Sequence, residues 1–288
     1  MFLPQHETDG CPKVVALLTD YGLADPYVGQ MKAVLTACLP GVALVDLTHG
    51  VPPHNVLAGA FFLDASLPWM PPGSVTVAVV DPGVGTSRRI VGLRRKGRLV
   101  LAPDNGLLTL LLLRGTMDGA WAFPVPETAS ATFHGRDVFA PLAAALAGGR
   151  PVLECGYEVD PASLVLLPGL NPTLEGGRLQ AKVLHVDRFG NLILNLRITE
   201  YEQVVRDAAG VSMELPGAPR IVRAAAYAAV PPGALGLLAG SQGHFELAMN
   251  RESAARETGL EPGDAVTLYL ADKPTEEPDK ALPLASER

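Results

Sequence analysis

The residues best suited to chemistry follow a short apolar run in the segment VAVVDPGVGTSRRIVGL, at positions 77–93. The run ends at Asp81, turns through two glycines and reaches Arg88. A carboxylate beside a guanidinium can fix a small oxygen nucleophile through directional hydrogen bonds. His134 lies in a later loop, and a neutral imidazole could orient such a nucleophile or receive its proton. The pattern indicates a site for a small polar ligand or a water molecule.

Polar side chains also follow the other apolar runs in the first half of the chain. They are Asp20, Asp46 with His49, and Asp104 with Asn105. A single aspartate at such a place commonly caps a helix or forms a turn. Because parallel strands end at one shared edge of a sheet, where these folds bind ligands, the repetition favours a binding site. Asp20, at the end of the first run, is well suited to accept both hydroxyls of a ribose.

The elements that must position these groups have the order of an α/β domain. Continuous apolar runs predict strands that are buried on both faces, and the segments between them have helical spacing. The β-α-β-α-β order implies a parallel sheet with right-handed crossovers. We therefore expect an N-terminal α/β domain with a mainly parallel sheet flanked by helices over residues 13–165. The expected strands are 13–20, 41–50 and 73–81, and the expected helices 24–39 and 54–70, followed by strand, turn and helix in RLVLAPDNGLLTLLLL and a helix after ATFHGRD.

The second half of the chain has a different character. LVLLPGLNPTLEGGRLQ is rich in proline and glycine, so residues 166–177 are expected to form a linker. Short strand-like runs follow and predict a smaller antiparallel β domain over 178–271. The polar tail, 272–288, is expected to be disordered. The runs are LQAKVLHVD, NLILNL, ALGLLAG, HFELAMN and AVTLYLA.

Composition limits the class of protein. With 288 residues, 48% of them hydrophobic, the chain can bury a substantial core, and its net charge of −7 does not favour nucleic-acid binding. The three cysteines, Cys11, Cys38 and Cys155, fit a reduced chain better than a disulfide framework. No secretion signal is apparent, and no apolar run is long enough for a membrane span. We expect a cytoplasmic protein with no membrane partner.

Other chemistries are open on the residues alone. Asp and His at strand ends could hold Mg²⁺, Mn²⁺ or Zn²⁺ in a metal-dependent phosphoesterase. Against this, the chain has no HExxH or CxxC spacing, and Arg88 and Arg136 would add positive charge beside the metal. No GxSxG occurs, and GVG at 83–85 is too short for a dinucleotide fingerprint. We expect neither a metal site nor a cofactor.

Taken in order, the motifs resemble one family, the S-adenosylmethionine (SAM) hydroxide adenosyltransferases. These SAM hydrolases are related to the nucleophilic fluorinase and chlorinase, and the similarity runs from about residue 13 to 270. It implies that water or hydroxide attacks C5′ of SAM to release adenosine and L-methionine. It also implies a barrel-like C-terminal domain and a homotrimer with sites between neighbouring subunits. The motifs are LLTDYGLADPYVGQMKAVL, VVDPGVGTSRR, LAPDNGLLT, ATFHGRDVFAPLAAALA, VDRFGN and GSQGHFELAMN.

The resemblance also implies roles for individual residues. Asp81, Arg88 and His134 match the triad of the hydroxide-using branch. Asp20 matches the acceptor of the ribose hydroxyls, and Asp25 and Asp187 match acids that hold the methionine ammonium. The remaining matches concern the adenosine pocket: Asn191 as an adenine-reading amide, Glu246 and Met249 in a strand that lines the pocket, and Ser241 in a segment that also meets the amino-acid part.

The triad favours water over a halide. The halogenases carry an uncharged residue where this chain has Asp81, and their halide lies beside a small hydroxyl residue near the position of Gly135. A carboxylate at 81 would repel a halide. Two departures bear on substrate affinity: His54 replaces a larger aromatic residue, and Gln242 replaces an arginine. A sensor that binds SAM or adenosine without turnover is the further alternative.

Several of the matched residues also have a structural alternative. His49, Asp46 and His185 we interpret as structural. The alternatives for the site residues are that Arg88 is a surface charge like Arg89, that His134 caps the helix beginning near Asp137, that Asp187 and Arg188 stabilise a turn, and that Glu246 faces solvent.

Overall fold

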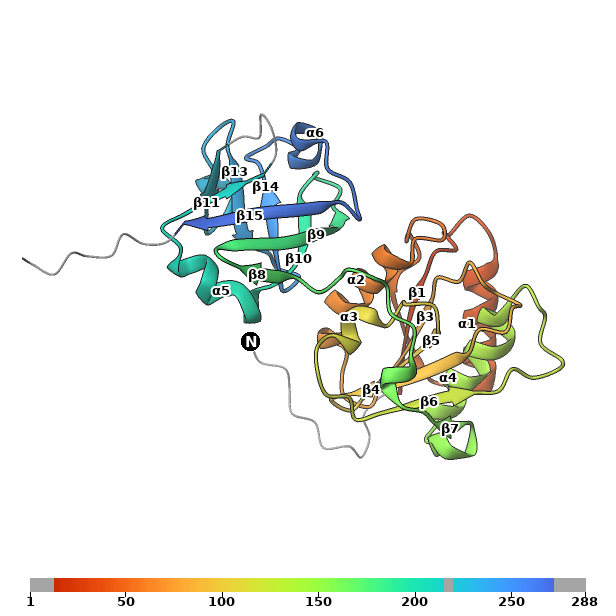
Figure 1. The fold of residues 1–288 in the computed structure, drawn as a ribbon. Helices are drawn as coiled ribbons and strands as arrows, with labels where there is room; N and C mark the ends of the chain where they lie inside the picture. Colours follow the sequence, from red (N-terminus) through yellow and green to blue (C-terminus); the bar gives the residue numbers. More distant parts are fainter. Residues whose placement is uncertain (1–12, 215–219, 272–288) are drawn as a thin grey trace, which may run out of the picture. The chain divides into compact units, whose positions relative to one another are not determined.

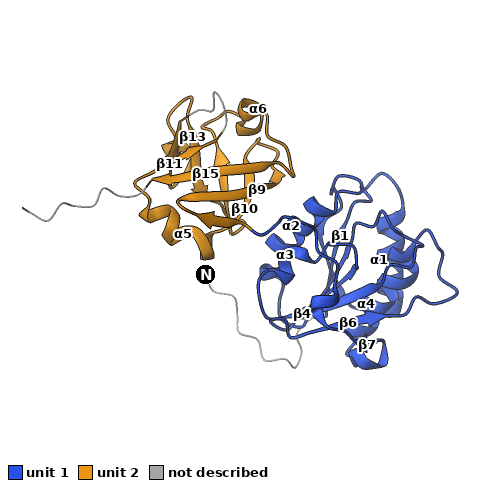
Figure 2. Cartoon of the chain, viewed as in Figure 1, with its two compact units in different colours: residues 1–171 blue, residues 172–288 orange. Residues whose placement is uncertain are grey.

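The computed structural model describes residues 13–214 and 220–271 of the chain. It divides the chain into two compact units, residues 1–171 and 172–288, which are called unit 1 and unit 2 below (Figure 2). The division falls inside the segment predicted to be a linker. Residues 272–288, predicted to be a disordered tail, and Cys11 lie outside the described residues.

Unit 1 contains a 7-stranded sheet in the order β2-β1-β3-β5-β4-β6-β7 (Figure 1). The strands β2, β1, β3 and β5 are parallel to one another, whereas the pairs β5–β4, β4–β6 and β6–β7 are antiparallel. The predicted α/β class is therefore confirmed, with a mixed, mostly parallel sheet. The strands are β1 (Val14–Thr19), β2 (Ala43–Thr48), β3 (Val75–Val79), β4 (Ile90–Arg95), β5 (Arg98–Pro103), β6 (Gly119–Phe123) and β7 (Tyr157–Glu158).

Helices cover both faces of this sheet, which explains why β1 and β3 read as continuous apolar runs (Figure 1). Met31 and Leu35 of α1 share one core cluster with Ala143 of α4 and with the sheet. The side chain of Asn55 accepts a hydrogen bond from the amide of Ala58 and so begins α2. The helices are α1 (Tyr27–Cys38), α2 (Val56–Ser66), α3 (Thr109–Leu112) and α4 (Ala140–Ala147), with a π-helical turn, η2 (Gly135–Phe139), before α4 and short 3-10 turns at η1 (Leu67–Trp69), η3 (Val152–Glu154) and η4 (Pro161–Ser163).

Unit 2 contains an 8-stranded sheet in the order β11-β15-β9-β10-β14-β13-β12, with β8 paired to β9. Its pairs are antiparallel except for β12 with β13, so the sheet is mostly antiparallel and forms the nearly closed, barrel-like domain that was expected. The five strand-like runs of the sequence are β9, β10, β13, β14 and β15. The strands are β8 (Thr173–Glu175), β9 (Arg178–Val186), β10 (Leu192–Arg197), β11 (Gly210–Met213), β12 (Ile221–Arg223), β13 (Leu235–Ala239), β14 (His244–Ala248) and β15 (Ala265–Ala271), and the helices are α5 (Ile198–Asp207), η5 (Tyr227–Ala229) and α6 (Ala254–Thr258).

Within residues 13–214 and 220–271, no helix is both long enough and apolar enough to span a membrane.

Candidate active site

The loop that follows β3 carries the first part of the site. Asp81 lies two residues beyond the end of the strand, and Arg88 lies two residues before β4 begins. Between them Gly85 has φ +78°, and a Cβ atom there would lie 2.4 Å from the carbonyl oxygen of Ala131. Only glycine tolerates both the left-handed backbone and this close approach. The glycine thus lets the loop lie against the segment that carries His134.

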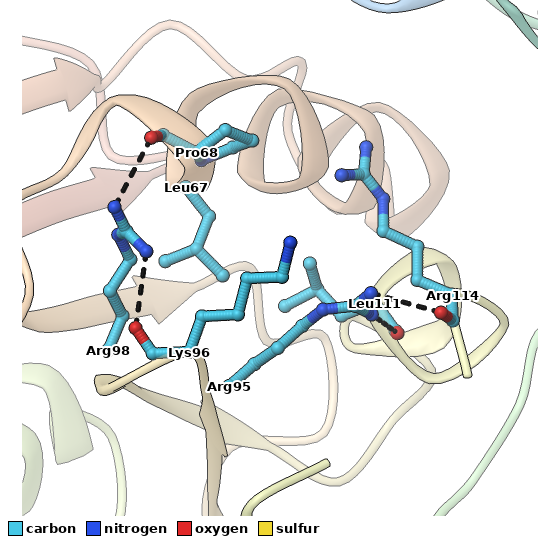
Figure 3. A pocket seen from close by; sticks show the side chains of 7 residues that line it. All are labelled: Leu67, Pro68, Arg95, Lys96, Arg98, Leu111 and Arg114. Carbon is cyan, nitrogen blue, oxygen red and sulfur yellow. Dashed lines mark hydrogen bonds between the residues drawn. The ribbon is translucent and has the colours of Figure 1, made fainter. Parts of the chain in front are cut away.

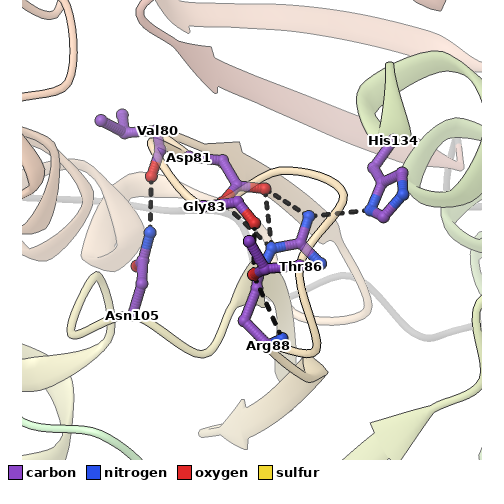
Figure 4. Close-up of polar contacts among 7 residues, drawn as sticks. All are labelled: Val80, Asp81, Gly83, Thr86, Arg88, Asn105 and His134. Atoms are coloured by element: carbon purple, nitrogen blue, oxygen red, sulfur yellow. Dashed lines mark hydrogen bonds and ion pairs between the residues drawn. The ribbon is translucent and has the colours of Figure 1, made fainter. Parts of the chain in front are cut away.

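Asp81 and Arg88 form a buried ion pair (Figure 4). Arg88 Nε donates to Asp81 Oδ1 at 3.0 Å and to Oδ2 at 2.9 Å, and Arg88 Nη2 also donates to Oδ2. Their side chains are only 8% and 4% exposed, so Arg88 is not a surface charge. Arg89 instead pairs with Asp104 and donates to the carbonyl oxygen of Ser163 at 2.6 Å. The two neighbouring arginines therefore have separate tasks.

His134 completes this group through its contact with Arg88. The distance from Arg88 Nη2 to His134 Nδ1 is 2.8 Å. Because a guanidinium can only donate, Nδ1 must accept, and the imidazole is neutral with its proton on Nε2. Burial lowers the pKa of His134, and the positive charge of Arg88 lowers it further. The side chain makes no capping hydrogen bond to the helix, so the capping alternative is wrong.

Arg88 also retains an unused donor. Its Nη1 atom is buried and has no hydrogen-bond partner within residues 13–214 and 220–271. A buried N–H group without a partner is costly, and a charged one more so. A water or hydroxide oxygen bound there would satisfy this donor. The group Asp81, Arg88 and His134 can therefore hold a small oxygen ligand next to a positive charge.

Tyr21 belongs to the same site, although sequence reasoning did not identify it. Burial raises the pKa of the Tyr21 phenol, and the carboxylates of Asp20 and Asp81 raise it further, which places the phenol near both. Its hydroxyl lies 2.7 Å from where a Cβ atom of Gly135 would be. The ring makes an edge contact with Phe133, at 6.0 Å between ring centroids. The sequence shows only that Tyr21 follows the strand-end acid Asp20, and this spacing does not distinguish a tyrosine of the site from a tyrosine of the core.

Asp20 and Asp25 lie after β1, as expected, and differ in environment. Asp20 Oδ2 accepts a hydrogen bond of 2.9 Å from the backbone amide of His54, which has a left-handed backbone with φ 64°. This contact ties the end of β1 to the loop that precedes α2. Asp25 is exposed in the segment before α1. Asp20 is therefore held in place, and Asp25 is free to meet a ligand at the surface.

The other strand-end acids already have cationic partners. Lys32 Nζ lies 2.6 Å from Asp46 Oδ2, and His49 Nε2 lies 3.1 Å from Asp46 Oδ1. Asp104 pairs with Arg89. A carboxylate held by an arginine or lysine is a poor ligand for a metal cation, and no group of three or more acidic, histidine or cysteine side chains suited to a metal occurs in the described part of the chain. These residues do not fit the metal-dependent phosphoesterase.

In unit 2, Asp187 and Asn191 form one compact turn. Asp187 Oδ1 accepts from the amides of Phe189 and Asn191, each at 2.9 Å, and Asp187 Oδ2 accepts from Asn191 Nδ2 at 2.9 Å. Asp187 therefore stabilises a turn, as the structural alternative held, but through Asn191 rather than Arg188. The turn fixes the Asn191 amide with one N–H group already engaged.

Glu246 lies in β14 and is only 6% exposed, so it does not face solvent. The hydroxyl of Tyr227 donates to Glu246 Oε1 at 2.5 Å. Burial raises the pKa of Glu246, and the charge of Asp187 raises it further, so the two acids lie near each other. The hydrogen bond to Glu246 raises the pKa of Tyr227 to about 12. Tyr227 is a second tyrosine that sequence reasoning missed.

Ser241 and Met249 have contrasting environments. Ser241 is exposed in the turn between β13 and β14. The side chain of Met249 is 4% exposed and belongs to the apolar core of unit 2. Its side chain therefore stabilises the barrel, and only its backbone remains for binding a ligand.

Known proteins resemble this chain in sequence and in fold. Residues 15–156 match the family described as SAM hydroxide adenosyltransferase N-terminal domain, and residues 181–267 match its C-terminal domain. An (R)-S-adenosyl-L-methionine hydrolase of Thermus thermophilus is 42% identical over 266 residues, which cover 88% of this chain and 98% of that protein. A fluorinase of Actinoplanes sp. is 27% identical over 300 residues, covering 90% of this chain and 98% of that protein. The crystal structure of an uncharacterized conserved protein from Thermotoga maritima has a TM-score of 0.80 at 31% identity, covering 88% of this chain and 99% of that one.

Proposed function

The chain belongs to the SAM hydroxide adenosyltransferase family, and we propose that Arg88, oriented by Asp81 and His134, holds the oxygen nucleophile of its reaction. The reaction is the hydrolysis of S-adenosyl-L-methionine to adenosine and L-methionine. The observation that carries the proposal is the buried Nη1 of Arg88, which has no hydrogen-bond partner in the described part of the chain. It lies in the group of side chains that, by the family resemblance, marks the hydroxide-using branch.

The nucleophile, rather than the leaving group, is the part of this reaction that requires catalysis. The water oxygen forms a bond to C5′, the C5′–S bond breaks with its electron pair passing to sulfur, and one proton is released. The sulfonium is already a good leaving group, so no acid is needed to protonate it. Holding the oxygen in line with the C5′–S bond can contribute up to about 7–11 kcal/mol in favourable cases. Positioning is therefore the main task of the site.

The three side chains divide this task. Arg88 Nη1 donates to the oxygen and stabilises the negative charge of a hydroxide. His134 directs its Nδ1 lone pair at Arg88 and carries its proton on Nε2, on the side of the ring away from Arg88, so it orients the guanidinium and does not act as the base. Asp81 Oδ1 accepts a single hydrogen bond from Arg88 and keeps a lone pair for the released proton. We assign proton acceptance to Asp81.

The remaining contacts would bind the substrate. The held carboxylate of Asp20 takes the ribose hydroxyls, and the free oxygen and second N–H of the Asn191 amide read the adenine edge. Asp25 and Asp187 bind the methionine ammonium. Glu246, Ser241 and the backbone of Met249 line the adenosine pocket. Since Gln242 replaces an arginine, the methionine carboxylate would rely on backbone amides, and His54, in place of a larger aromatic residue, would lie near the ribose.

We further propose a homotrimer, with sites between neighbouring subunits, in the cytoplasm. Two large apolar side chains next to predicted binding acids support burial against another subunit: Leu23, near Asp25, is 76% exposed, and Phe189, near Asp187, is 72% exposed. Cys38 and Cys155 are free, which fits a reducing compartment. Light scattering coupled to size-exclusion chromatography would give the mass of three chains if the assembly is correct.

The function is tested by incubating EDTA-treated protein with the separated (R)- and (S)-sulfonium epimers of SAM, with and without chloride. We expect equal amounts of adenosine and methionine, independent of EDTA and chloride, with the (R)-epimer preferred as the name of the Thermus relative suggests. No turnover of SAM, together with EDTA-sensitive hydrolysis of a phosphoester such as p-nitrophenyl phosphate, would favour the phosphoesterase. A 5′-chloro product would place the chain with the halogenases, and tight binding without turnover would indicate a sensor.

A further inference from the structure

Cationic side chains surround a hollow in unit 1 that the hydrolase site does not use (Figure 3). Because β5 runs parallel to β3, with Leu99 opposite Val75, the start of β5 lies at the edge of the sheet opposite to Asp81. The hollow is therefore separated from the catalytic group by the length of the strands. This basic pocket is lined by Leu67, Pro68, Arg95, Lys96, Arg98, Leu111 and Arg114.

Two of the arginines are held in place by backbone carbonyls rather than by direct ion pairs, although Asp64 and Asp118 lie close enough to Arg95 to offset part of its charge. Arg95 Nη1 donates to the carbonyl oxygen of Leu111 at 2.9 Å, and Arg95 Nη2 donates to that of Arg114 at 3.0 Å. Arg98 Nε donates to the carbonyl oxygen of Met70 at 2.5 Å. Carbonyl groups fix the direction of a guanidinium but carry no opposing net charge. The positive charge of the pocket is therefore preorganised.

Arg114 and Lys96, the two other cations of the pocket, still have donor groups that could bind an anion. Arg114 pairs with the fully buried Asp64, yet its Nε is buried and has no hydrogen-bond partner in the described part of the chain. The ammonium of Lys96 extends into the hollow and makes no hydrogen bond or ion pair with any described residue (Figure 3). Burial and the charge of Arg114 lower the pKa of Arg95, as expected where like charges gather. An anion would relieve this repulsion.

We propose that the basic pocket binds a phosphate-bearing small molecule whose organic part rests on the exposed ring of Pro68, since Leu67 and Leu111 line the hollow but are only 3% and 2% exposed. A phosphate offers several oxygens and up to two negative charges, which suits separate guanidinium and ammonium donors better than a single carboxylate does. The apolar ring of Pro68 favours an organic phosphate over the free ion. SAM carries a sulfonium charge that this pocket repels, so the site is not a second substrate site.

The test uses probes without an adenine, because an adenine could enter the hydrolase site. Inorganic phosphate and phenyl phosphate are titrated into the full chain by calorimetry, with wild type, Lys96→Asn and Arg150→Gln compared. Asparagine removes the ammonium and tolerates the left-handed backbone at Lys96, where φ is 48°. Arg150 is an exposed cation outside the pocket, so Arg150→Gln matches the change in net charge.

We expect both probes to bind the wild type, with phenyl phosphate the tighter of the two. Lys96→Asn should weaken both at least tenfold, whereas Arg150→Gln should leave both unchanged. The absence of binding at millimolar probe, or equal affinity in wild type and Lys96→Asn, would overturn the site. Equal affinity for the two probes would overturn the role of Pro68. None of these results depends on hydrolase activity.

Discussion

At the scale of single residues, the roles of Arg88 and Arg89 can be separated although they are adjacent. Arg88→Lys keeps a positive charge but loses the planar set of donors that contacts Asp81, His134 and the nucleophile. We expect kcat to fall by about 10²–10³, the usual loss for one preorganised donor. Steady-state kinetics on SAM gives the value.

Arg89→Lys is the matched control. Arg89 pairs with Asp104 and is 34% exposed, so its substitution should lower the melting temperature slightly and leave kcat within a factor of two or so. Equal losses of kcat in Arg88→Lys and Arg89→Lys would mean that the two arginines only support the loop, and that Arg88 does not position the nucleophile.

The neutral state of His134 predicts a pH dependence of stability. Its folded pKa lies below the ordinary value of 6.5, so the unfolded chain binds more protons near and below that pH. The free energy of unfolding should therefore fall as the pH drops from 7.5 through 6.5, and the loss should continue until the lowered pKa is passed. Urea unfolding at a series of pH values measures this decline.

His134→Asn provides the comparison, because its amide oxygen can accept from Arg88 without titrating. The wild type should lose more stability than this variant between pH 7.5 and 5. Parallel curves for the two proteins would show that His134 keeps no depressed pKa, and the assignment of its tautomer would fail. Activity of the wild type should likewise decline only on the acid side of 6.5.

At the scale of elements, the loop from Asp81 to Arg88 is the part of the fold on which the site depends most. Gly85→Ala would place a Cβ atom 2.4 Å from the carbonyl oxygen of Ala131 and strain a backbone with φ +78°. We expect a loss of stability of about 1–3 kcal/mol and at least a tenfold loss in kcat/KM, because the loop must move. Thermal unfolding and kinetics report the two effects.

Gly83→Ala controls for the loss of a glycine in the same loop. A Cβ atom there meets nothing nearer than Thr86 Oγ1 at 3.5 Å, so stability should change by less than about 0.5 kcal/mol. If both alanine variants were equally stable and active, the close approach at Gly85 would have no part in holding the site.

Much of the fold followed from apolar periodicity, and the exceptions have physical causes. The continuous burial of β1 and β3 made both strands visible in the sequence. The apolar run LLTLLLL predicts a helix, but only Thr109–Leu112 is helical, because periodicity cannot define the length of so uniform a run. The β4–β5 hairpin escaped prediction because its turn uses Lys96 and Gly97 rather than an Asn-Gly pair.

The candidate site was less completely predictable from the sequence than the fold. Asp81, Arg88 and His134 could be placed together because a family resemblance supplied the register, and their contacts are now on view in unit 1. Tyr21 and Tyr227 could not be found, since their importance rests on where a phenol oxygen lies relative to a carboxylate. Sequence spacing does not encode that distance.

At the scale of the whole molecule, the residues proposed to act in one reaction lie on both units. Asp81, Arg88, His134 and Asp20, the proposed nucleophile and ribose groups, belong to unit 1, and Asp187, Asn191 and Glu246, proposed to bind the rest of the substrate, belong to unit 2. The proposed trimer would supply both sets to each site, which is why the mass of the assembly bears on function.

Charge also differs from place to place in this acidic chain. The net charge is −7, yet the basic pocket gathers Arg95, Lys96, Arg98 and Arg114 in one hollow. The overall negative charge of the chain gave no sign of this local cluster of cations. Net charge excludes classes of macromolecular partner and says little about a single small-molecule site.

In the proposed mechanism a water oxygen held by Arg88 attacks C5′ of SAM. Hydrolysis in ¹⁸O-labelled water, followed by mass spectrometry of both products, tests this step directly. We predict one ¹⁸O atom in the 5′-hydroxyl of adenosine and none in methionine. Label in homoserine, together with 5′-methylthioadenosine, would mean attack on the methionine side chain and would contradict this mechanism.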